Sequence, residues 1–312
     1  MDLTIPNSRH DLHQNSSIQD YDLVISCKPT HFKKFIKHKK YYKRFLNYSK
    51  LILIGSQDLK NFIKDDPSIK FINEDKFVTE NQMEKFLLKM RGTELKKRRR
   101  WYKQQFIKMG YARICRKEYY LIFDGDTFPI KNFNMFKNDH PIFDMYNFFY
   151  KPFIESMDRL IPGLKYSKSK SYVTEHMIIR TKYMKNLLDD IEMNSNIPGK
   201  LFWQKIFISV DDKNLPKNGF SEYFVYGAYV DTKYPKFYYH RDFLSLRGAE
   251  IFYGTPENLD ENDIKWLSQY YHALTFEDWH HFQEKFFANA ENIEKNLKNI
   301  IKNNTNNSIG II

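Results

Sequence analysis

Two aspartates after an apolar run are the residues of this sequence best suited to chemistry. The segment Tyr119 to Asp126 reads YYLIFDGD, which predicts a strand that ends in Asp124 and Asp126. Side chains two residues apart on a strand project to the same side. In parallel α/β sheets, ligands bind beyond the carboxyl ends of the strands. We therefore expect both carboxylates to face one ligand, with Gly125 allowing that ligand to approach the backbone.

Two converging carboxylates suit a magnesium or manganese ion, which would also hold a diphosphate through its oxygens. This pattern predicts transfer of a sugar from a nucleotide-sugar donor. The cation would neutralise the charge that grows on the leaving nucleoside diphosphate. Asp126, at the end of the strand, is the expected direct metal ligand, and Asp124 is expected at the metal, the ribose or the donor sugar.

The same residues fit a second enzyme class. Four apolar residues followed by Asp-Gly-Asp-Thr also match phosphatases of the haloacid dehalogenase type, in which Asp124 would be the nucleophile and Asp126 a general acid. Such an enzyme needs a later acidic pair at a second strand end. The pairs at 189–190 and 211–212 lack the expected preceding strand. A strand terminus with solvated acids is the remaining alternative.

The elements that would position the aspartates alternate between short apolar runs and helical patterns, which predicts an α/β fold with a mostly parallel sheet between helices. A helix over about 98–116 leads into the strand that ends in the aspartate pair. The other expected elements are strands at 21–27, 51–56 and 69–72 and helices at 29–42 and 79–90.

Later segments are harder to assign. Thr174 is expected to cap a helix, because Met177, Met184, Leu188 and Ile191 fall on one helical face. The stretch 218–229 is expected to be a loop that enters a strand or helix. We expect a polar segment at 1–20, one catalytic domain at 21–287, and an Asn- and Lys-rich helical or flexible tail at 288–312.

The chain is basic, with 50 Lys and Arg residues against 38 Asp and Glu residues and a net charge of +12. Such a charge can attract a polyanion, an anionic membrane surface or a phosphorylated small molecule. The run KKRRR at 96–100 lacks an interleaved aromatic surface or a recognition motif, so nucleic acid is not an expected partner. A module that binds polyanions without catalysis is the non-enzymatic alternative.

Cysteine content and hydropathy bear on location. Cys27 and Cys115 show no metal-ligand spacing, which fits a reducing cytoplasm. The first twenty residues lack an apolar stretch of signal-peptide length, and no run approaches the roughly 20 apolar residues of a membrane span. We expect a cytoplasmic protein, with any membrane contact peripheral and at the inner face of the cytoplasmic membrane.

Four motifs together resemble a group of bacterial glycosyltransferase-like proteins with a GT-A-type nucleotide-diphospho-sugar transferase fold. Members have a Trp-x-x-Gln-Gln helix, a strand ending in Asp-x-Asp-Thr, a helix opened by His, and a Ser-Glu-Tyr-x-x-Tyr-Gly signature. The resemblance covers about 101–248 and implies assembly of cell-surface polysaccharide or lipopolysaccharide. In this sequence the motifs fall on Trp101, Gln104, Gln105, Asp124, Asp126, Thr127, His176, Ser221, Glu222, Tyr223, Tyr226 and Gly227.

The resemblance also suggests roles for these residues. Glu222 is the candidate base that takes a proton from the acceptor hydroxyl of an inverting hexosyltransferase; in a retaining enzyme it would position substrate. Gln104, Gln105 and Lys108 are expected at the nucleotide sugar. The expected donor is a nucleotide-diphosphate sugar, with a UDP-sugar favoured, and the expected acceptor is a glycan or a lipid-linked glycan.

The remaining candidates rest on position. His240 follows an aromatic segment and is a candidate third ligand for the metal or the diphosphate, with Arg241 and Arg247 as alternative phosphate contacts. Glu175 and His176 are expected to open a helix whose amides contact a sugar or an anion, as substrate-binding residues. Tyr223 and Arg247 complete the expected substrate-binding set.

Overall fold

The computed structural model describes residues 19–63, 66–95 and 97–277. A five-stranded sheet in the order β3-β2-β1-β4-β8 forms its centre. The first four of these strands are parallel, and β8 runs antiparallel to β4. The expected α/β architecture with a mostly parallel sheet is confirmed. The strands are β1 (Tyr21–Ser26), β2 (Lys50–Gly55), β3 (Ile69–Asn73), β4 (Tyr119–Asp124) and β8 (His176–Arg180).

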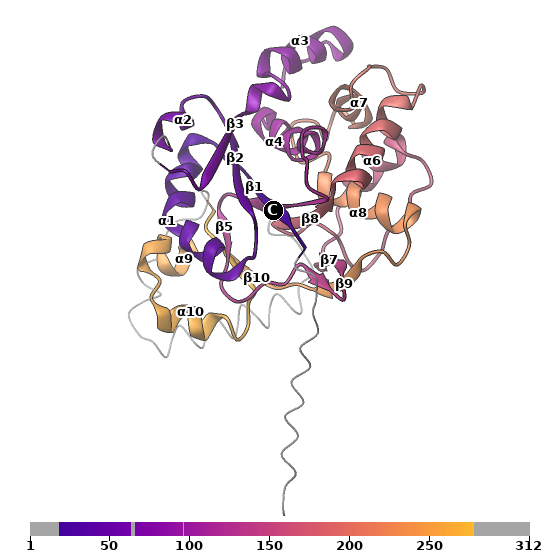
Figure 1. The fold of residues 1–312 in the computed structure, drawn as a ribbon. Coiled ribbons are helices and arrows are strands. Elements are labelled where there is room, and N and C mark those ends of the chain that lie inside the picture. The colour runs from indigo at the N-terminus through magenta and orange to yellow at the C-terminus, as the bar shows by residue number, and fades with distance from the viewer. Residues whose placement is uncertain (1–18, 64–65, 96, 278–312) are drawn as a thin grey trace, which may run out of the picture.

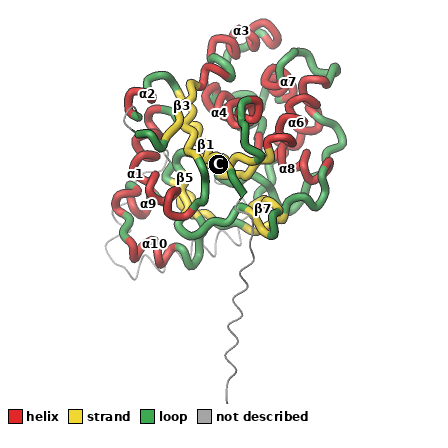
Figure 2. Tube along the Cα trace, in the orientation of Figure 1, coloured by secondary structure: helices red, strands yellow, loops and turns green. Residues whose placement is uncertain are grey.

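Helices cover both faces of this sheet (Figures 1 and 2). Figure 1 shows α1, α9 and α10 on one side of the strands and α4, α6, α7 and α8 on the other. Strands covered on both faces must be apolar throughout, and every residue of β1 is buried. The helices are α1 (Pro29–Phe45), α2 (Leu59–Phe62), α3 (Glu80–Arg91), α4 (Arg99–Gly110), α5 (Lys151–Leu160), α6 (Thr181–Met193), α7 (Phe202–Ser209), α8 (Glu222–Lys233), α9 (Glu250–Tyr253) and α10 (Glu261–Leu267).

Two small sheets join distant segments to the centre. One contains β10 (Ser245–Arg247), β11 (Ala273–Thr275) and β5 (Thr127–Pro129), and the other contains β6 (Phe136–Lys137), β7 (His140–Met145) and β9 (Tyr239–Asp242). Because β5 follows the aspartate pair directly, its antiparallel pairing with β11 brings residues near 275 beside the end of β4.

The strand that leads to the aspartate pair is shorter than expected. β4 ends at Asp124, and Gly125 and Asp126 form a turn into β5. The alternation of side chains along a strand therefore does not determine where Asp126 points. The conformation of the turn determines the direction of this side chain.

The expected helix capped by Thr174 is wrong in its first part. Residues His176–Arg180 form the edge strand β8, in which Phe123 pairs with His176, and helix α6 starts only at Thr181. A short apolar run such as HMIIR fits a buried strand as well as a helix by periodicity. Hydrogen bonding to β4 decides for the strand.

The stretch 218–229, expected as a loop that enters a strand or helix, contains most of helix α8. Ser221 caps this helix, because its hydroxyl accepts a hydrogen bond from the backbone nitrogen of Phe224 at 3.3 Å. Gly227 lies inside the helix rather than at its end, since the ring of Tyr172 packs on its backbone. The expected tail at 288–312 lies outside the described residues.

Gly227 provides a test of the packing between α8 and Tyr172. A Cβ atom at this position would lie 2.2 Å from Cγ of Tyr172. Gly227→Ala should therefore lower the free energy of unfolding by about 1–3 kcal/mol, measured by urea denaturation. Gly110→Ala on α4 is the matched control, because its nearest contact, a Phe77 ring atom, would be at 3.0 Å. An equal change in both variants would contradict this packing.

His38 gives the fold a pH dependence. It lies on α1, is fully buried, and stacks on Phe128 at 4.6 Å between ring centroids. Burial lowers the pKa of His38 from 6.5 to about 3. Below pH 6.5 the unfolded chain binds a proton that the folded chain does not, so stability falls as the pH falls.

For this single group, a decrease from pH 6.5 to 5.5 should lower the free energy of unfolding by about 1 kcal/mol. His38→Phe, which cannot titrate, should lose less stability than the wild type over the same interval. Denaturation curves at the two pH values measure the difference. Identical pH dependence in both proteins would show that His38 is protonated in the folded state.

Candidate active site

The candidate site lies at the carboxyl end of β4, where the backbone of the turn is held on two sides. The backbone nitrogen of Asp124 donates to the carbonyl oxygen of Glu175 at 2.8 Å. The carbonyl oxygen of Asp126 accepts from the backbone nitrogen of Phe276 at 2.9 Å. The residue before β8 and the residue after β11 thus fix the aspartate pair in place.

Lys108 is the centre of the charge arrangement beside Asp124. Its side chain is 2% exposed, and its Nζ lies 2.6 Å from Oδ1 of Asp124 and 2.8 Å from Oε1 of Glu222. The ring of Tyr223 lies under the ammonium group, with its centroid at 4.5 Å, and the Tyr223 hydroxyl donates to Asp124 Oδ1 at 3.4 Å. One buried cation therefore joins the end of β4 to the start of α8.

Glu222, the candidate base, is as buried as Lys108, with 2% of its side chain exposed. In the amide orientation that gives each atom a complementary partner, the side-chain nitrogen of Gln105 donates to both oxygens of Glu222. Burial raises the pKa of Glu222, and Lys108 opposes this rise. A base must reach the acceptor hydroxyl. The geometry instead favours a positioning role for Glu222, and the base role stays a prediction.

Asp126 differs from Asp124 in having no ion pair with any described residue. Its side chain accepts one long hydrogen bond, from the hydroxyl of Thr127 at 3.5 Å. Burial, followed by the charges of Asp124 and Glu277, raises the pKa of Asp126 to about 7. Among the described residues no cation pairs directly with this carboxylate, so its charge is left uncompensated by an ion pair, although Arg247 nearby acts to lower its pKa.

A second ion-pair group stands across the turn, on the segment brought in by the β10-β11-β5 sheet. Nε of Arg247 lies 3.2 Å from Oε1 of Glu175, and Nη2 of Arg247 lies 2.8 Å from Oε1 of Glu277. Ser245 donates to the other oxygen of Glu175 at 3.1 Å. Sequence reasoning missed Glu277, because it belongs to no motif and follows the aspartates by about 150 residues.

The two groups leave the site negatively charged within a basic protein. Among the described residues, five carboxylates lie around the turn, against the cations Lys108, Arg247 and Lys34. The Nζ of Lys34 donates to the backbone carbonyl oxygens of Phe276 and Glu277. Within the described residues, no three His, Cys, Asp or Glu side chains are close enough together to hold a metal by themselves. A magnesium-like ion usually takes one or two carboxylates and completes its shell with water and substrate phosphates, which this arrangement fits. The five carboxylates are Asp124, Asp126, Glu175, Glu222 and Glu277.

His240 and Gln104, which were expected to contact the metal and the nucleotide sugar, lie on different elements from the aspartate pair. His240 lies on β9 with 46% of its side chain exposed, and its Nε2 is 3.0 Å from Oδ2 of Asp231. Gln104 donates from its side chain to the carbonyl oxygen of Ser26, at the end of β1, at 3.3 Å. Since Ser26 of β1 pairs with Asp124 of β4, Gln104 lies at the same sheet edge as Asp124.

His176 is a core residue and does not open a helix. Its side chain is 1% exposed, its Nε2 is 2.7 Å from Oδ2 of Asp144, and its ring stacks on Phe123 at 4.9 Å. Arg241 contacts both oxygens of Asp144, at 2.6 and 2.8 Å. His176 was expected to contact substrate at the start of a helix. It instead belongs to a buried network with Asp144 and Arg241.

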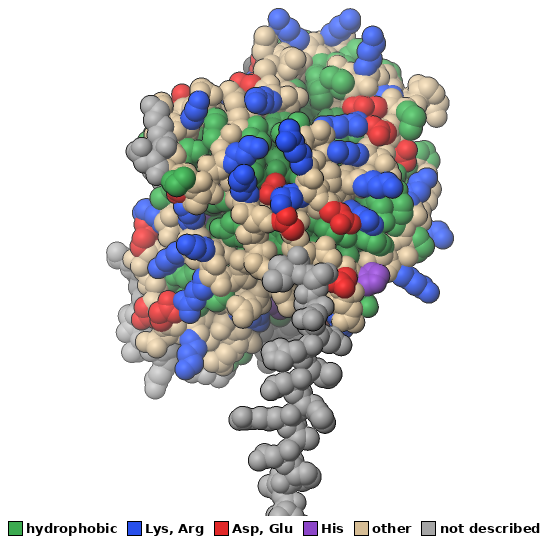
Figure 3. All heavy atoms as spheres, in the orientation of Figure 1, with side chains coloured by type: hydrophobic (Ala, Val, Ile, Leu, Met, Phe, Trp, Pro, Cys, Tyr) green, Lys and Arg blue, Asp and Glu red, His purple; other side chains and the backbone are tan. Residues whose placement is uncertain are grey.

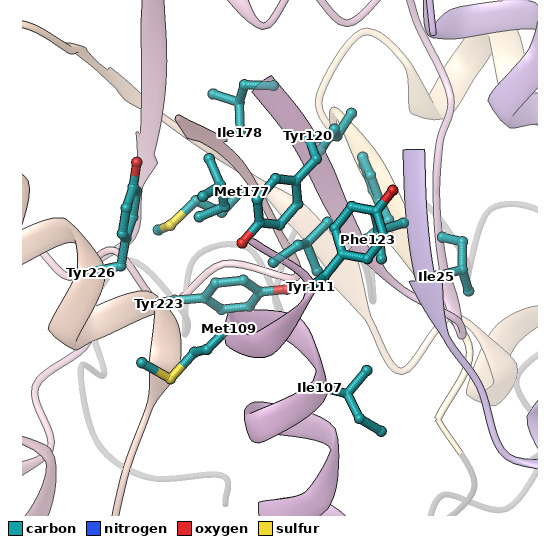
Figure 4. Close-up of a cluster of buried hydrophobic side chains, with 14 of the residues drawn as sticks. Ile25, Ile107, Met109, Tyr111, Tyr120, Phe123, Met177, Ile178, Tyr223 and Tyr226 are labelled. Atoms are coloured by element: carbon teal, nitrogen blue, oxygen red, sulfur yellow. The ribbon is translucent and has the colours of Figure 1, made fainter. Parts of the chain in front are cut away.

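Apolar packing holds α4 and α8 against the sheet (Figure 4). The close-up shows Met109 of α4 and Tyr223 and Tyr226 of α8 facing Tyr120 of β4 and Met177 of β8. The exposed fraction is 3% or less for each of these side chains. Lys108 lies beside this apolar cluster, which explains why water does not screen its two ion pairs.

The basic run at 96–100 is partly neutralised by helix α3. Arg99 forms ion pairs with Glu80, at 2.8 Å, and with Glu84, and Arg100 approaches Glu80 at 3.4 Å. Figure 3 shows Lys and Arg side chains interspersed with Asp and Glu side chains on the viewed face. No helix in the described part of the chain is long and apolar enough to cross a membrane.

Comparison with known proteins gives a family and distant structural likenesses. Residues 32–293 match the model of DUF6492, a family of unknown function. No curated protein matches the chain.

Among solved structures, the chain is similar to mouse xyloside xylosyltransferase 1, with 10% identity over 73% of this chain and 87% of that chain and a TM-score of 0.40. It is also similar to galactosyltransferase LgtC in complex with donor and acceptor sugar analogues, with 10% identity over 88% and 94% and a TM-score of 0.42. A third similar structure is the glycosyltransferase GlyE of Streptococcus pneumoniae TIGR4, with 11% identity over 84% of this chain and 57% of that chain and a TM-score of 0.39. At such low TM-scores these likenesses decide nothing about the site.

The Asp144 network behind the site can be tested through stability. Asp144→Ala leaves His176 and Arg241 without the carboxylate that both contact, and the Asp144 side chain is fully buried. Removing one partner from a buried ion pair should lower the free energy of unfolding by about 3–5 kcal/mol. Urea denaturation measures this loss. Glu261→Ala, which removes the partner of exposed Arg44, should cost less, and an equal loss would argue against the buried network.

Proposed function

The chain belongs to DUF6492, a family of unknown function, and we propose that it is a GT-A-type glycosyltransferase that moves a sugar from a nucleotide-diphosphate donor to a glycan acceptor. The observation that carries the proposal is the uncompensated carboxylate of Asp126 at the carboxyl edge of a parallel sheet, beside the ordered and ion-paired Asp124. Ligands bind at this edge in α/β proteins.

A divalent metal, magnesium or manganese, fits the residues present. Asp126 would hold it, with Asp124 as a second ligand or as a contact to the donor, and the excess of carboxylates gives the turn the charge that a cation requires. When bound, the metal would neutralise charge on the departing nucleoside diphosphate. His240 lies in an ion pair with Asp231, so we do not include it in the proposed ligand set.

The chain's own residues would order the donor and the reacting groups. Gln104 is placed to contact the nucleotide, since its amide already lies at the end of β1. Tyr223 orients Asp124 through its hydroxyl, and Glu175 with Arg247 borders the opposite side of the turn. Arg247 is about half exposed, so its guanidinium can also meet phosphate or sugar oxygens.

The choice of UDP-sugar, the acceptor and a role in cell-surface polysaccharide or lipopolysaccharide synthesis rest on the sequence resemblance. A cytoplasmic location near the inner membrane face rests on the cysteine content and on the lack of an apolar stretch of signal-peptide length in the first twenty residues. An inverting reaction needs a base other than a fully engaged Glu222, whereas a retaining reaction would use Glu222 to position substrate. We therefore propose the transfer without a stereochemical outcome.

The phosphatase alternative loses the second acidic pair that it requires. Asp189 pairs with Arg113, and Tyr229 donates to Asp190, both on helix α6. Asp211 and Asp212, after helix α7, pair with Arg159 and Arg91 respectively. All four carboxylates have structural partners of their own, and none follows a strand.

Donor binding provides the direct test. The melting temperature should rise when a nucleotide-diphosphate sugar is added with manganese, in a panel of UDP-, GDP-, CDP- and dTDP-sugars. A donor at 100 times its Kd should add about 2.7 kcal/mol of stability. No manganese-dependent rise with any donor would refute the proposal. Turnover of p-nitrophenyl phosphate that Asp124→Asn abolishes would establish a phosphatase instead.

Asp126→Asn should remove the manganese-dependent part of this rise. Without metal, the variant should keep or gain stability, because it removes one of several crowded negative charges. Asp158→Asn, at an exposed position on α5, is the matched control and should respond to manganese and donor like the wild type. A manganese response that survives Asp126→Asn would exclude Asp126 as the metal ligand.

A further inference from the structure

Lys108 cannot contact a substrate without leaving its present position. Its side chain is 2% exposed, and its ammonium group already contacts two carboxylates and an aromatic ring. The backbone of the same residue is also engaged, because the Tyr120 hydroxyl donates to the Lys108 carbonyl oxygen at 3.1 Å. The expected role of Lys108 as a direct nucleotide-sugar contact does not fit this burial.

The carboxylates that Lys108 joins belong to elements far apart in the chain. Asp124 ends β4, and Glu222 is the first residue of α8. Without the ammonium group, the negative charge of Asp124, whose side chain is 30% exposed, would face that of the buried Glu222. Like charges in such a place repel each other. The contact between the start of α8 and the end of β4 therefore depends on a cation at position 108.

Gln105 strengthens the same connection from the preceding turn of α4. Its amide donates to the carboxylate of Glu222, so two neighbouring residues on one helix face hold the first residue of α8. Tyr223 follows directly and donates to Asp124. Movement of Glu222 would therefore also move the hydroxyl that orients Asp124.

We propose that Lys108 is a positioning residue. Its buried ammonium group locks Asp124 and Glu222 together and thereby leaves Asp126 as the carboxylate that is free for the metal and diphosphate of the donor. This assigns different tasks to the two aspartates of the turn. The inference rests on the proposed transferase function for its catalytic consequence, but the lock itself is a property of the protein without substrate.

Helix α4 contains its own control for this proposal. Lys103, five residues earlier, is also buried and also contacts two carboxylates, with Nζ 2.8 Å from Glu74 and 2.8 Å from Asp75. Its partners are 21% and 55% exposed and belong to the short 3-10 helix η1 (Glu74–Lys76). Lys103→Met thus removes a comparable lysine without touching the turn.

The lock is tested by whether a second substitution raises or lowers the melting temperature of the first variant. Lys108→Met should lower the melting temperature by on the order of 10 °C, because the buried carboxylate of Glu222 and the half-buried one of Asp124 lose their cation. Adding Glu222→Gln to this variant should raise the melting temperature again, since it removes one of the repelling charges. No recovery, or a further decrease, would overturn the lock.

If Lys108→Met alone is insoluble, the double variant decides. Recovery of soluble, folded protein in Lys108→Met/Glu222→Gln supports the lock, and a double variant that is equally insoluble overturns it. Circular dichroism and gel filtration report the folded state without any need for substrate.

The positioning role is then measured as release of nucleoside diphosphate, with manganese, from the nucleotide sugar that stabilises the wild type most. Measured against Glu222→Gln, which keeps Lys108, the double variant should lose roughly 100-fold in kcat, mostly without a change in the KM for donor, because its catalytic groups are folded but misplaced. Lys103→Met should stay within about 3-fold of the wild type. Equal activity in the double variant and in Glu222→Gln would overturn the positioning role.

The two proposals can fail separately. If the wild type neither binds nor turns over any donor, the transferase proposal fails, and with it the catalytic part of this inference. The change in melting temperature between Lys108→Met and the double variant still decides whether the lock exists.

Discussion

The arrangement of this protein depends on a buried ammonium group between two carboxylates. Lys108 lies 2.6 Å from Asp124 and 2.8 Å from Glu222, where almost no water reaches it. A buried ion pair contributes little net stability compared with apolar packing, but breaking it is costly. Its proposed effect is to restrict the arrangements open to the chain, because packing α4, β4 and α8 together without the ammonium group would leave two carboxylates facing each other.

The small sheet of β5, β10 and β11 supplies the other half of the site. β5 begins immediately after Asp126, and its pairing with β11 brings Glu277 and Arg247 to the turn. From the other side, α1 contributes Lys34, whose Nζ donates to the carbonyl oxygen of Phe276 at 3.2 Å. A segment about 150 residues after the aspartates thereby becomes part of their surroundings.

Charge is distributed unevenly between the surface and the site. The chain has a net charge of +12, yet among the described residues five carboxylates lie around the turn against three cations, Lys34, Lys108 and Arg247. The basic run near α4 is partly neutralised by Glu80 and Glu84 of α3. The basic surface can attract an anionic donor from a distance, whereas the acidic centre suits a cation that would accompany a diphosphate.

The sequence by itself determined the α/β class and the first four strands, and it singled out Asp124 and Asp126 as candidates, because apolar runs, turns and acidic strand ends are local patterns. It did not determine that Asp126 lies in a turn, or that His176 begins an edge strand, since a five-residue apolar run fits a strand or a helix until a neighbouring strand pairs with it. Only the tertiary structure brought Lys108 to Glu222, 114 residues away, and Glu277 to the turn. Ion pairs between distant segments leave no periodic signal in a single sequence, because their spacing depends on how the intervening elements pack.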